Sequence, residues 1–227
     1  MEESKSCAFG LLIFIGESEY VKELLSHWNT LVYKLWAPFY DTLLGALFAP
    51  ARQRAMGVLD LRGDERVLLV GVGTGADLPH LPGDTRAVGI DFSPAMLAQA
   101  VDKLPSMAGR ASLSQADAQR LPVLDNSVDV AVLSLILSVV PNGQHCFNEA
   151  MRALRPGGRL LVFDKFLPNN QQLTLPRQML NLITVLFGTN INRRFSDIAA
   201  GHKFTPVYQE ASLFGGAYQI ILIQKED

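Results

Sequence analysis

The sequence predicts a doubly wound α/β fold built on a mostly parallel β-sheet, and three observations support this. From Arg66 onward, short apolar runs alternate with helical segments, as in successive βαβ units. The apolar runs lack polar alternation, which is typical of strands covered on both faces. A glycine-rich turn follows the first run, and an aspartate closes the second, as in nucleotide-binding α/β sheets.

The composition indicates a globular protein with one sizeable domain. Apolar residues make up 48% and charged residues 19% of the 227 residues, which argues against disorder. The net charge of −2 offers no basic face, so we expect no nucleic-acid partner. Two cysteines cannot form a disulfide framework, and we expect a cytoplasmic location. The apolar runs at 8–15 and 130–140 are shorter than the roughly 20 residues that cross a bilayer.

A helical zone, from residue 17 to about residue 61, precedes the first strand. Apolar and aromatic residues recur there at spacings of three and four, as on one helix face. Pro38 and Pro50 are each expected to open a new helix, because proline suits the first helical turn. We therefore divide the chain into an N-terminal helical segment, 1–61, and a compact unit, 62–227.

The remaining elements follow in order. Ser93 can cap a helix that Pro94 opens. The residues at 155–158 (RPGG) end a later helix and begin a strand. A turn at 214–216 (FGG) should join two antiparallel strands that close the sheet. The expected strands are 66–70, 86–90, 111–115, 128–134, 158–164, 204–209 and 217–223, and the expected helices are 76–80, 94–104 and 143–154.

The glycine-rich turn at 71–75 (GVGTG) and Asp91 together predict a nucleoside site. Glycine suits a tight turn where a ligand approaches bare backbone. Asp91 lies 20 residues after Gly71, where a carboxylate can accept hydrogen bonds from ribose hydroxyls. The spacing is GxGxG, whereas nicotinamide-dependent oxidoreductases have GxGxxG. A nicotinamide-dependent oxidoreductase is therefore the weaker alternative.

Several motifs, taken in order, resemble those of class I S-adenosylmethionine-dependent methyltransferases. More narrowly, the chain is similar to the bacterial phosphatidylethanolamine and ubiquinone/menaquinone-type methyltransferases. The resemblance implies a seven-stranded sheet with an antiparallel last strand, a Rossmann-like methyltransferase fold and an N-terminal helical lid. The matching residues are 37–41 (APFYD), 70–75 (VGVGTG), 89–94 (GIDFSP), 117–118 (DA), 121–122 (LP), 135–140 (LILSVV), 154–158 (LRPGG) and 188–193 (GTNINR).

The resemblance implies S-adenosyl-L-methionine as the cofactor and gives individual residues a role in binding it. Asp91 would hold the ribose, while Phe92 and Met96 would contact the adenine. Asp117 would accept a hydrogen bond from the adenine amino group, with the amide of Ala118 as a companion donor to the adenine. Ser134, at the carboxyl end of the fourth strand, either faces the ligand or bonds to backbone. The remaining residues expected at the cofactor are Gly71, Gly73, Thr74, Gly75 and, on the lid, Tyr33.

One position departs from the family pattern. The family usually has an acidic residue two positions before the first glycine, where it contacts the methionine ammonium, but here that residue is Leu69. A charged hydrogen bond of this kind contributes roughly 1.5–3 kcal/mol. Asp77 or a loop carbonyl are the candidate replacements. The alternative that this departure leaves is a member of the family that binds the cofactor without catalysing methyl transfer.

Three residues are candidates for the chemistry. Tyr40 resembles a family tyrosine on the lid, with aromatic packing as the alternative role. His145 is expected in the loop after the fourth strand, and an exposed loop histidine is its simpler interpretation. Asp164 ends the fifth strand, where it would face the pocket or cap a helix. No CxxC or HxxxH spacing accompanies Cys146, so no metal is expected.

The acceptor is predicted to be a small, rather apolar molecule or a lipid. Apolar residues are frequent in the segment 165–202, where they either cover the sheet or form a wall that suits a lipid, quinone, aromatic or alkyl-thiol acceptor better than a sugar. Phospholipid amines are the leading candidates, with thiols and quinone precursors as further options. The aromatic residues at 28–48 suggest either a lid or a peripheral contact with a membrane interface. Nothing in the sequence indicates an oligomeric state.

Overall fold

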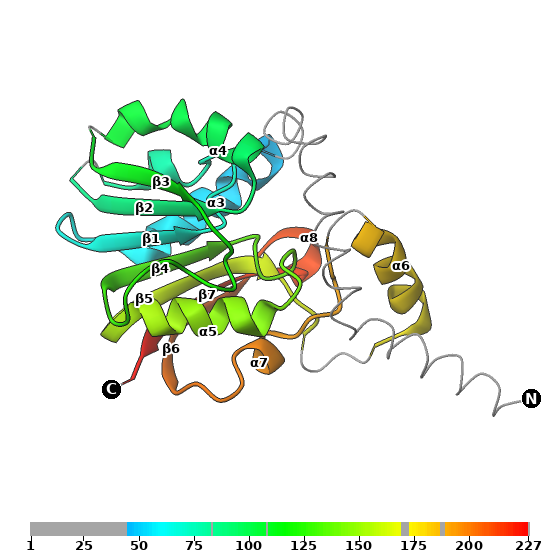
Figure 1. Cartoon of the computed structure of the whole chain (residues 1–227). Helices are drawn as coiled ribbons and strands as arrows, with labels where there is room; N and C mark the ends of the chain where they lie inside the picture. The colour runs from blue at the N-terminus through cyan, green and yellow to red at the C-terminus, as the bar shows by residue number, and fades with distance from the viewer. Residues whose placement is uncertain (1–44, 83, 108, 169–172, 187–188, 227) are drawn as a thin grey trace, which may run out of the picture.

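The computed structural model describes residues 45–82, 84–107, 109–168, 173–186 and 189–226 (Figure 1). Seven strands of this part form one sheet, in the order β3-β2-β1-β4-β5-β7-β6. The first five strands along the chain run parallel, and β7 is antiparallel to both β5 and β6. The predicted doubly wound sheet with a reversed last strand is therefore confirmed. The strands are β1 Arg66–Val70, β2 Arg86–Asp91, β3 Ala111–Gln115, β4 Val128–Ser134, β5 Leu154–Lys165, β6 Phe204–Ala211 and β7 Tyr218–Lys225.

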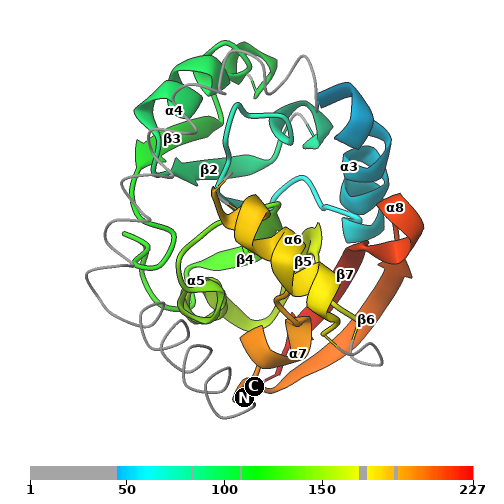
Figure 2. The ribbon, with the colours of Figure 1, turned by 90° about the vertical axis from the view of Figure 1, so that its right-hand side faces the viewer.

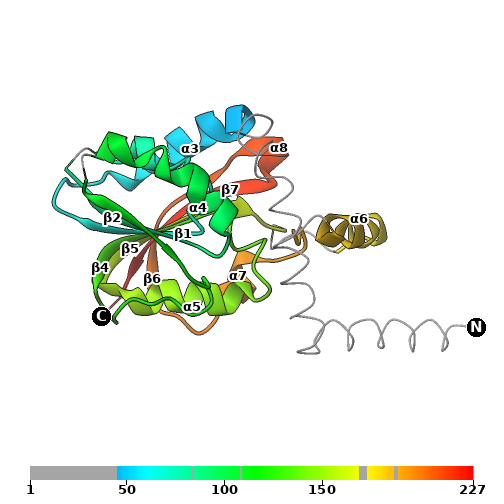
Figure 3. The ribbon, with the colours of Figure 1, turned by 45° about the horizontal axis from the view of Figure 1, so that its top comes forward.

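The helices cover both faces of this sheet. Figure 3 shows α3, α4 and α8 on one side of the strands and α5 and α7 on the other. The helices are α3 Ala46–Leu59, α4 Pro94–Val101, α5 Gly143–Ala153, α6 Leu175–Leu186, α7 Phe195–Ile198 and α8 Leu213–Gly216, with short 3-10 helices η2 Leu78–His80 and η3 Leu104–Met107. Within the described ranges, no helix has the length and apolar character needed to cross a membrane.

Alternating strand residues build two separate layers of the core. One layer packs strand residues such as Leu68 and Leu133 against Phe147 of α5. The other packs Leu69 and Phe163 against α3, where Phe48 lies edge-on to Phe163 with 6.2 Å between ring centroids. On α3, the buried positions 48, 51, 55 and 59 recur at intervals of three and four. Apolar burial on both faces fixes the sheet between the helices.

Two expected helix starts are wrong. The segment at 76–80 forms turns and the short 3-10 helix η2, because Gly75 has φ +78° and Pro79 lacks an amide hydrogen. Pro50 lies inside α3 rather than opening a helix. Pro50 has no amide hydrogen to donate to the carbonyl one turn earlier in the helix. Its side chain is exposed, so water can hydrogen-bond to that carbonyl instead. In contrast, Ser93 accepts a hydrogen bond from the amide of Met96 and Pro94 begins α4, as expected.

Most strand limits agree with the sequence within two residues. β5 begins four residues earlier than expected, because Leu154 pairs with Val128 before an irregularity in the ladder. The turn at 214–216 is present, with Phe214, Gly215 and Gly216 all at positive φ. Residues 1–44, which make up most of the predicted lid segment 1–61 and include Tyr33, Pro38 and Tyr40, lie outside the described residues.

The order of the strands places a crevice at the centre of the sheet. β1 lies between β2 and β4, so the connections leave β1 and β4 toward opposite faces. In such sheets ligands bind at the carboxyl ends of the strands where the order reverses. Figure 2 looks onto this edge and shows α6 crossing in front of it. The predicted site residues follow β1, β2, β3 and β4 at this edge.

Candidate functional site

A cavity of about 150 Å³ opens at the carboxyl ends of β1, β2 and β4. A single water requires roughly 10–15 Å³ of such space, so the cavity admits a small organic ligand. Its lining joins the glycine turn, the end of β2, the segment after β3 and the loop after β4. The lining residues are Arg52, Gly71, Val72, Gly73, Thr74, Ala76, Asp91, Phe92, Ser93, Met96, Asp117, Ala118, Gln119, Ser134, Leu135, Ile136, Val139, Val140 and Pro141.

The glycine turn leaves bare backbone at the cavity. Gly73 has φ +56°, a left-handed conformation that side chains rarely adopt. A Cβ atom added there would have no neighbour closer than 4.0 Å, and Gly73 lines the cavity. Its missing side chain therefore leaves space for a ligand. At Gly75, an added Cβ would lie 3.1 Å from Ala100 of α4, so this glycine permits close helix packing instead.

Asp91 connects the end of β2 to the glycine turn. Its carboxylate accepts hydrogen bonds from the amides of Gly73 and Ser93, both at 2.8 Å. Burial raises the pKa of the Asp91 carboxyl, and the bonds from Ser93 and Gly73 oppose that rise. A carboxylate offers about four acceptor positions, so two remain for hydroxyl groups of a ligand. Asp91 is thus positioned to accept two further hydrogen bonds in the cavity.

The segment after β3 supplies a second carboxylate to the same cavity. Asp117 accepts from the amide of Gln119 at 2.8 Å, and the side-chain amide of Gln119 lies 3.2 Å from the same oxygen. Gln119 in turn accepts from the amide of Asn142 at 2.9 Å, which links this segment to the start of α5. Ala118 and Met96 are buried, whereas Phe92 is 49% exposed. Gln119 was not expected from the sequence.

Arg52 of α3 reaches the cavity on the other side of β1. Its Nη1 lies 2.8 and 2.9 Å from the two carboxylate oxygens of Asp77 and donates to Ser134 Oγ at 2.9 Å. The side chains of Arg52 and Asp77 are 11% and 6% exposed, so the ion pair is largely buried. Ser134 therefore bonds to an arginine rather than to the backbone. The sequence provided no signal for Arg52, because it lies on a helix remote from every motif.

Leu69, the departure from the family pattern, points away from the cavity. It is 2% exposed and belongs to the apolar layer that includes Ala51 and Ala55 of α3. It does not line the cavity. The predicted replacement, Asp77, is itself paired with Arg52.

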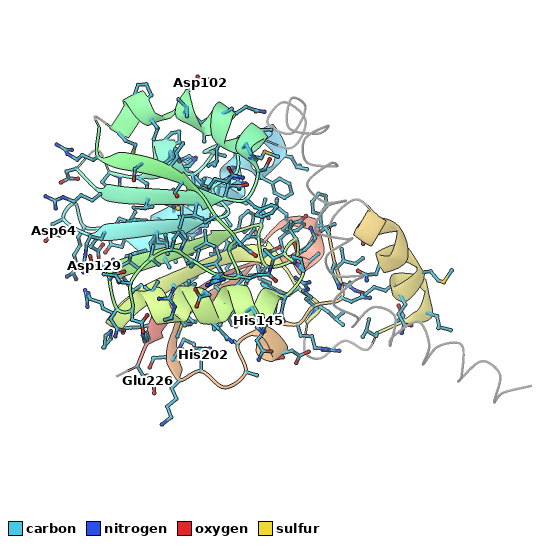
Figure 4. All side chains as sticks on the ribbon, in the orientation of Figure 1. Asp64, Asp102, Asp129, His145, His202 and Glu226 are labelled. Carbon is cyan, nitrogen blue, oxygen red and sulfur yellow. The ribbon has the colours of Figure 1, made fainter. Side chains whose placement is uncertain are left out.

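Two of the candidate catalytic residues lie away from the cavity lining. His145 is exposed in the first turn of α5, so its expected position in a loop is wrong (Figure 4). The side chain of Asn142 caps this helix through the His145 amide at 3.1 Å, and the helix begins at Gly143, as the predicted helix 143–154 required. Asp164 is fully buried and accepts from the amides of Ser138 and Lys165, at 3.0 and 2.8 Å. Burial raises the pKa of the Asp164 carboxyl.

Asp164 instead supports the loop that forms one wall of the cavity. Ser138, to which it bonds, lies in the loop that follows β4. The loop begins at Leu135, a non-glycine residue with φ +60° whose amide bonds to the Phe163 carbonyl at 2.7 Å. Such conformations cost about 1–3 kcal/mol and are concentrated at functional sites. Leu135, Ile136, Val139 and Val140 give this wall an apolar surface.

In the ranges that the structure covers, no three His, Cys, Asp or Glu side chains are grouped to hold a metal ion. Cys146 is buried, and burial raises the pKa of its thiol well above the usual range. The charged groups at the opposite edge of the sheet are also remote from the cavity. Asp129, which pairs with Arg66 and Arg155, lies at that edge in Figure 4.

Comparisons with known proteins agree with this geometry. Residues 68–162 match a family model described as a methyltransferase domain. The chain is 31% identical over 195 residues to the phosphatidylethanolamine N-methyltransferase of Cereibacter sphaeroides, covering 85% of this chain and 95% of that protein. It is 37% identical over 144 residues to the ubiquinone/menaquinone biosynthesis C-methyltransferase UbiE of Syntrophotalea carbinolica, covering 60% of this chain and 61% of that relative.

Solved structures share the fold at low identity. A SAM-dependent methyltransferase from Thermotoga maritima superposes with a TM-score of 0.63 at 19% identity, covering 86% of this chain and 99% of that one. The [4+2]-cyclase SpnF superposes with a TM-score of 0.62 at 22% identity, and the match covers 78% of this chain and 81% of that one. These likenesses establish the fold, which by itself does not determine the reaction.

Proposed function

Because this chain belongs to the class I S-adenosylmethionine-dependent methyltransferases, we propose that it methylates a small, rather apolar acceptor, with a phospholipid amine as the favoured substrate. The observation that carries this choice is the 31% identity to a phosphatidylethanolamine N-methyltransferase along 85% of this chain. The likeness covers 195 residues and so extends well beyond the family model at 68–162. This extent supports carrying over the kind of acceptor as well as the cofactor.

The residues at the cavity suit the cofactor. Asp91 would accept hydrogen bonds from the two ribose hydroxyls, and Asp117 would accept one from the adenine amino group. The amide of Ala118 would donate to a ring nitrogen of the adenine. Phe92 and Met96 would contact the adenine ring, and the bare backbone at Gly73 would accommodate the methionine portion. When bound, S-adenosylmethionine supplies an electrophilic methyl group on a sulfonium centre. Gly71, Thr74 and Ser134 complete the proposed set around it, whereas Gly75, predicted with them, lies outside the cavity lining and serves the packing of α4.

The residues of the chain contribute mainly by alignment and by excluding water. Displacement at a methyl group needs the donor, methyl and nucleophile in line, and holding them so contributes several kcal/mol. Asp164 lies outside the cavity lining, so we assign it to positioning the loop after β4 through Ser138. His145, exposed on α5, receives no role at the reacting atoms. Tyr40 and Tyr33 stay as the proposed lid residues, with the phenol oxygen of Tyr40 as the candidate hydrogen-bond acceptor for the amine, whose proton passes to water.

Apolar surface near the cavity favours a lipid acceptor. The loop after β4 presents Leu135, Ile136 and Val139 to the cavity. Beyond this edge of the sheet, α6 exposes Leu175 and Met179, 74% and 65% accessible and one helical turn apart. We propose that this face of α6 touches the membrane peripherally when a lipid acceptor is taken up.

The direct test measures S-adenosylhomocysteine release with vesicles of phosphatidylethanolamine and phosphatidylcholine, and with vesicles of phosphatidylcholine alone as control. We expect release that depends on the primary amine lipid and yields the N-methylated headgroup. Release without any dependence on the amine lipid would contradict the acceptor assignment. Failure to bind either S-adenosylmethionine or S-adenosylhomocysteine at millimolar concentration in calorimetry would contradict the cofactor assignment.

A quinone precursor is the second candidate acceptor, because the chain is 37% identical to UbiE over 144 residues. Demethylmenaquinone in the same assay distinguishes the two. A catalytically silent relative is the third, motivated by Leu69; it would bind the cofactor and release no product with any acceptor.

A further inference from the structure

The charged residues around the cavity are arranged asymmetrically. Within the described lining, the acidic side chains are Asp91 and Asp117, and the basic side chain is Arg52. Asp91 ends β2 and Asp117 follows β3, whereas the charged group of Arg52 bonds to Ser134 at the end of β4. Because β1 lies between β2 and β4, the two acids and the arginine lie on opposite sides of β1. The cavity thus has two carboxylates at one end and a guanidinium, itself paired with Asp77, at the other.

This arrangement matches the charges of an adenosyl amino acid. Its nucleoside end offers hydroxyl and amino donors, which carboxylates accept, and its single anionic group is the α-carboxylate at the other end. From β3 to β4 the sheet spans three strand intervals, about 14 Å in all, which suits an extended ligand. Leu69 carries no acid, and the Asp77 carboxylate lies outside the cavity lining and is already paired with Arg52.

We infer that Arg52 binds the α-carboxylate of the cofactor, so that the amino-acid end is recognised through its anion, whereas the family pattern relies on an acid that contacts the ammonium. The inference rests on the proposed use of S-adenosylmethionine. Arg52 is the binding residue, and Asp77 is a positioning residue because both of its carboxylate oxygens hold the guanidinium at Nη1. Ser134 fixes the same nitrogen from the β4 side.

The local packing favours this role. A guanidinium presents a planar fork of donors to a carboxylate, and a largely buried guanidinium is already ordered before a ligand arrives. The buried pair joins α3 to the turn after β1, although α3 lies far from that turn in the sequence. Buried ion pairs are costly to form, so their retention beside a cavity indicates a function beyond stability.

The test compares two ligands that differ only in the α-carboxylate: S-adenosylhomocysteine and its decarboxylated analogue. Calorimetry on the full-length protein measures the Kd of each. We expect the wild type to prefer S-adenosylhomocysteine by about tenfold or more, the effect of one charged hydrogen bond. In Arg52→Gln/Asp77→Asn, which removes both charges of this pair together, the preference should fall to within about threefold.

Arg54→Gln is the matched control, since Arg54 lies on the same helix but pairs with Glu210 and is 59% exposed. It should keep the wild-type preference. Equal affinity of the wild type for the two ligands would overturn the inference, and this measurement needs no variant. A thermally stable double variant that retains the preference would overturn it as well. Binding of neither ligand to the wild type would instead overturn the cofactor assignment and the inference with it.

Discussion

Replacement of Asp91 by alanine tests the nucleoside site most directly. In the structure, two of about four acceptor positions on its carboxylate are used by the amides of Gly73 and Ser93. Two charged hydrogen bonds from ribose would contribute up to about 3–6 kcal/mol, and the desolvation that raises the pKa of Asp91 offsets part of this. We expect a net loss of about 2–3 kcal/mol, or roughly 30- to 150-fold in the Kd of S-adenosylhomocysteine.

The fold should tolerate this change. The amides of Gly73 and Ser93 belong to residues that line the cavity, so water can replace the lost carboxylate. We expect the free energy of unfolding to fall by less than about 1.5 kcal/mol. The measurements are calorimetric titration and urea unfolding, with Asp102→Ala as the matched control. Asp102 is an exposed aspartate at the end of α4, on the outer surface in Figure 4.

The pH dependence of ligand binding provides an independent check on Asp91. Because the pKa of the Asp91 carboxyl is raised, it should gain a proton at a higher pH than an ordinary aspartate. Affinity should therefore decline as the pH falls toward that raised value, and Asp91→Ala should lose this component of the pH dependence. An Asp91→Ala protein that binds within threefold of the wild type would refute the ribose contact. An equal loss in Asp102→Ala would show that the effect is not local.

Three further predictions concern stability and the glycine turn. Asp129→Asn should lower the free energy of unfolding by about 1 kcal/mol at neutral pH, because arginine hydrogen bonds lower the pKa of Asp129. Urea unfolding should show this deficit shrinking as the pH falls below the ordinary pKa of an aspartate. A deficit that stays constant across pH would contradict this. Phe147→Ala, at a fully buried site, should cost about 3–5 kcal/mol in the same assay, and a loss below about 1 kcal/mol would contradict the packing of α5. Gly73→Ala should weaken cofactor binding in calorimetry more than it lowers stability, because its Cβ enters the cavity; unchanged affinity would contradict the proposed backbone contact.

Most of the sheet could be predicted from the sequence because its signals are local. The strands β1 and β4 are largely apolar runs, and caps such as Ser93 mark helix starts directly. The segment at 76–80 was misjudged because apolar spacing does not reveal that Gly75 adopts a positive φ. The helix at Pro50 was misjudged because a proline signal cannot show whether a helix has already begun.

The cavity was harder to predict, because its walls come from distant parts of the chain. The glycine turn and Asp91 belong to one βαβ unit, and their spacing was sufficient to place them together. Arg52 is separated from Ser134 by 82 residues, and only packing of α3 on the sheet brings them into contact. Asp164 was expected at the pocket because it lies near a strand end, but alternation along β5 turns it toward the loop after β4.

The backbone at Leu135 has a consequence for how this protein would respond to selection. A bulky residue in a left-handed conformation sacrifices stability, yet here it ends β4 abruptly and turns the following residues across the ligand cavity. Substitutions that relieve the positive φ at Leu135 should therefore appear readily in screens for thermal stability. The selected variants would lose the shape of the cavity wall that the loop after β4 forms. At this one residue, a gain in thermal stability would then come with a loss of catalytic turnover.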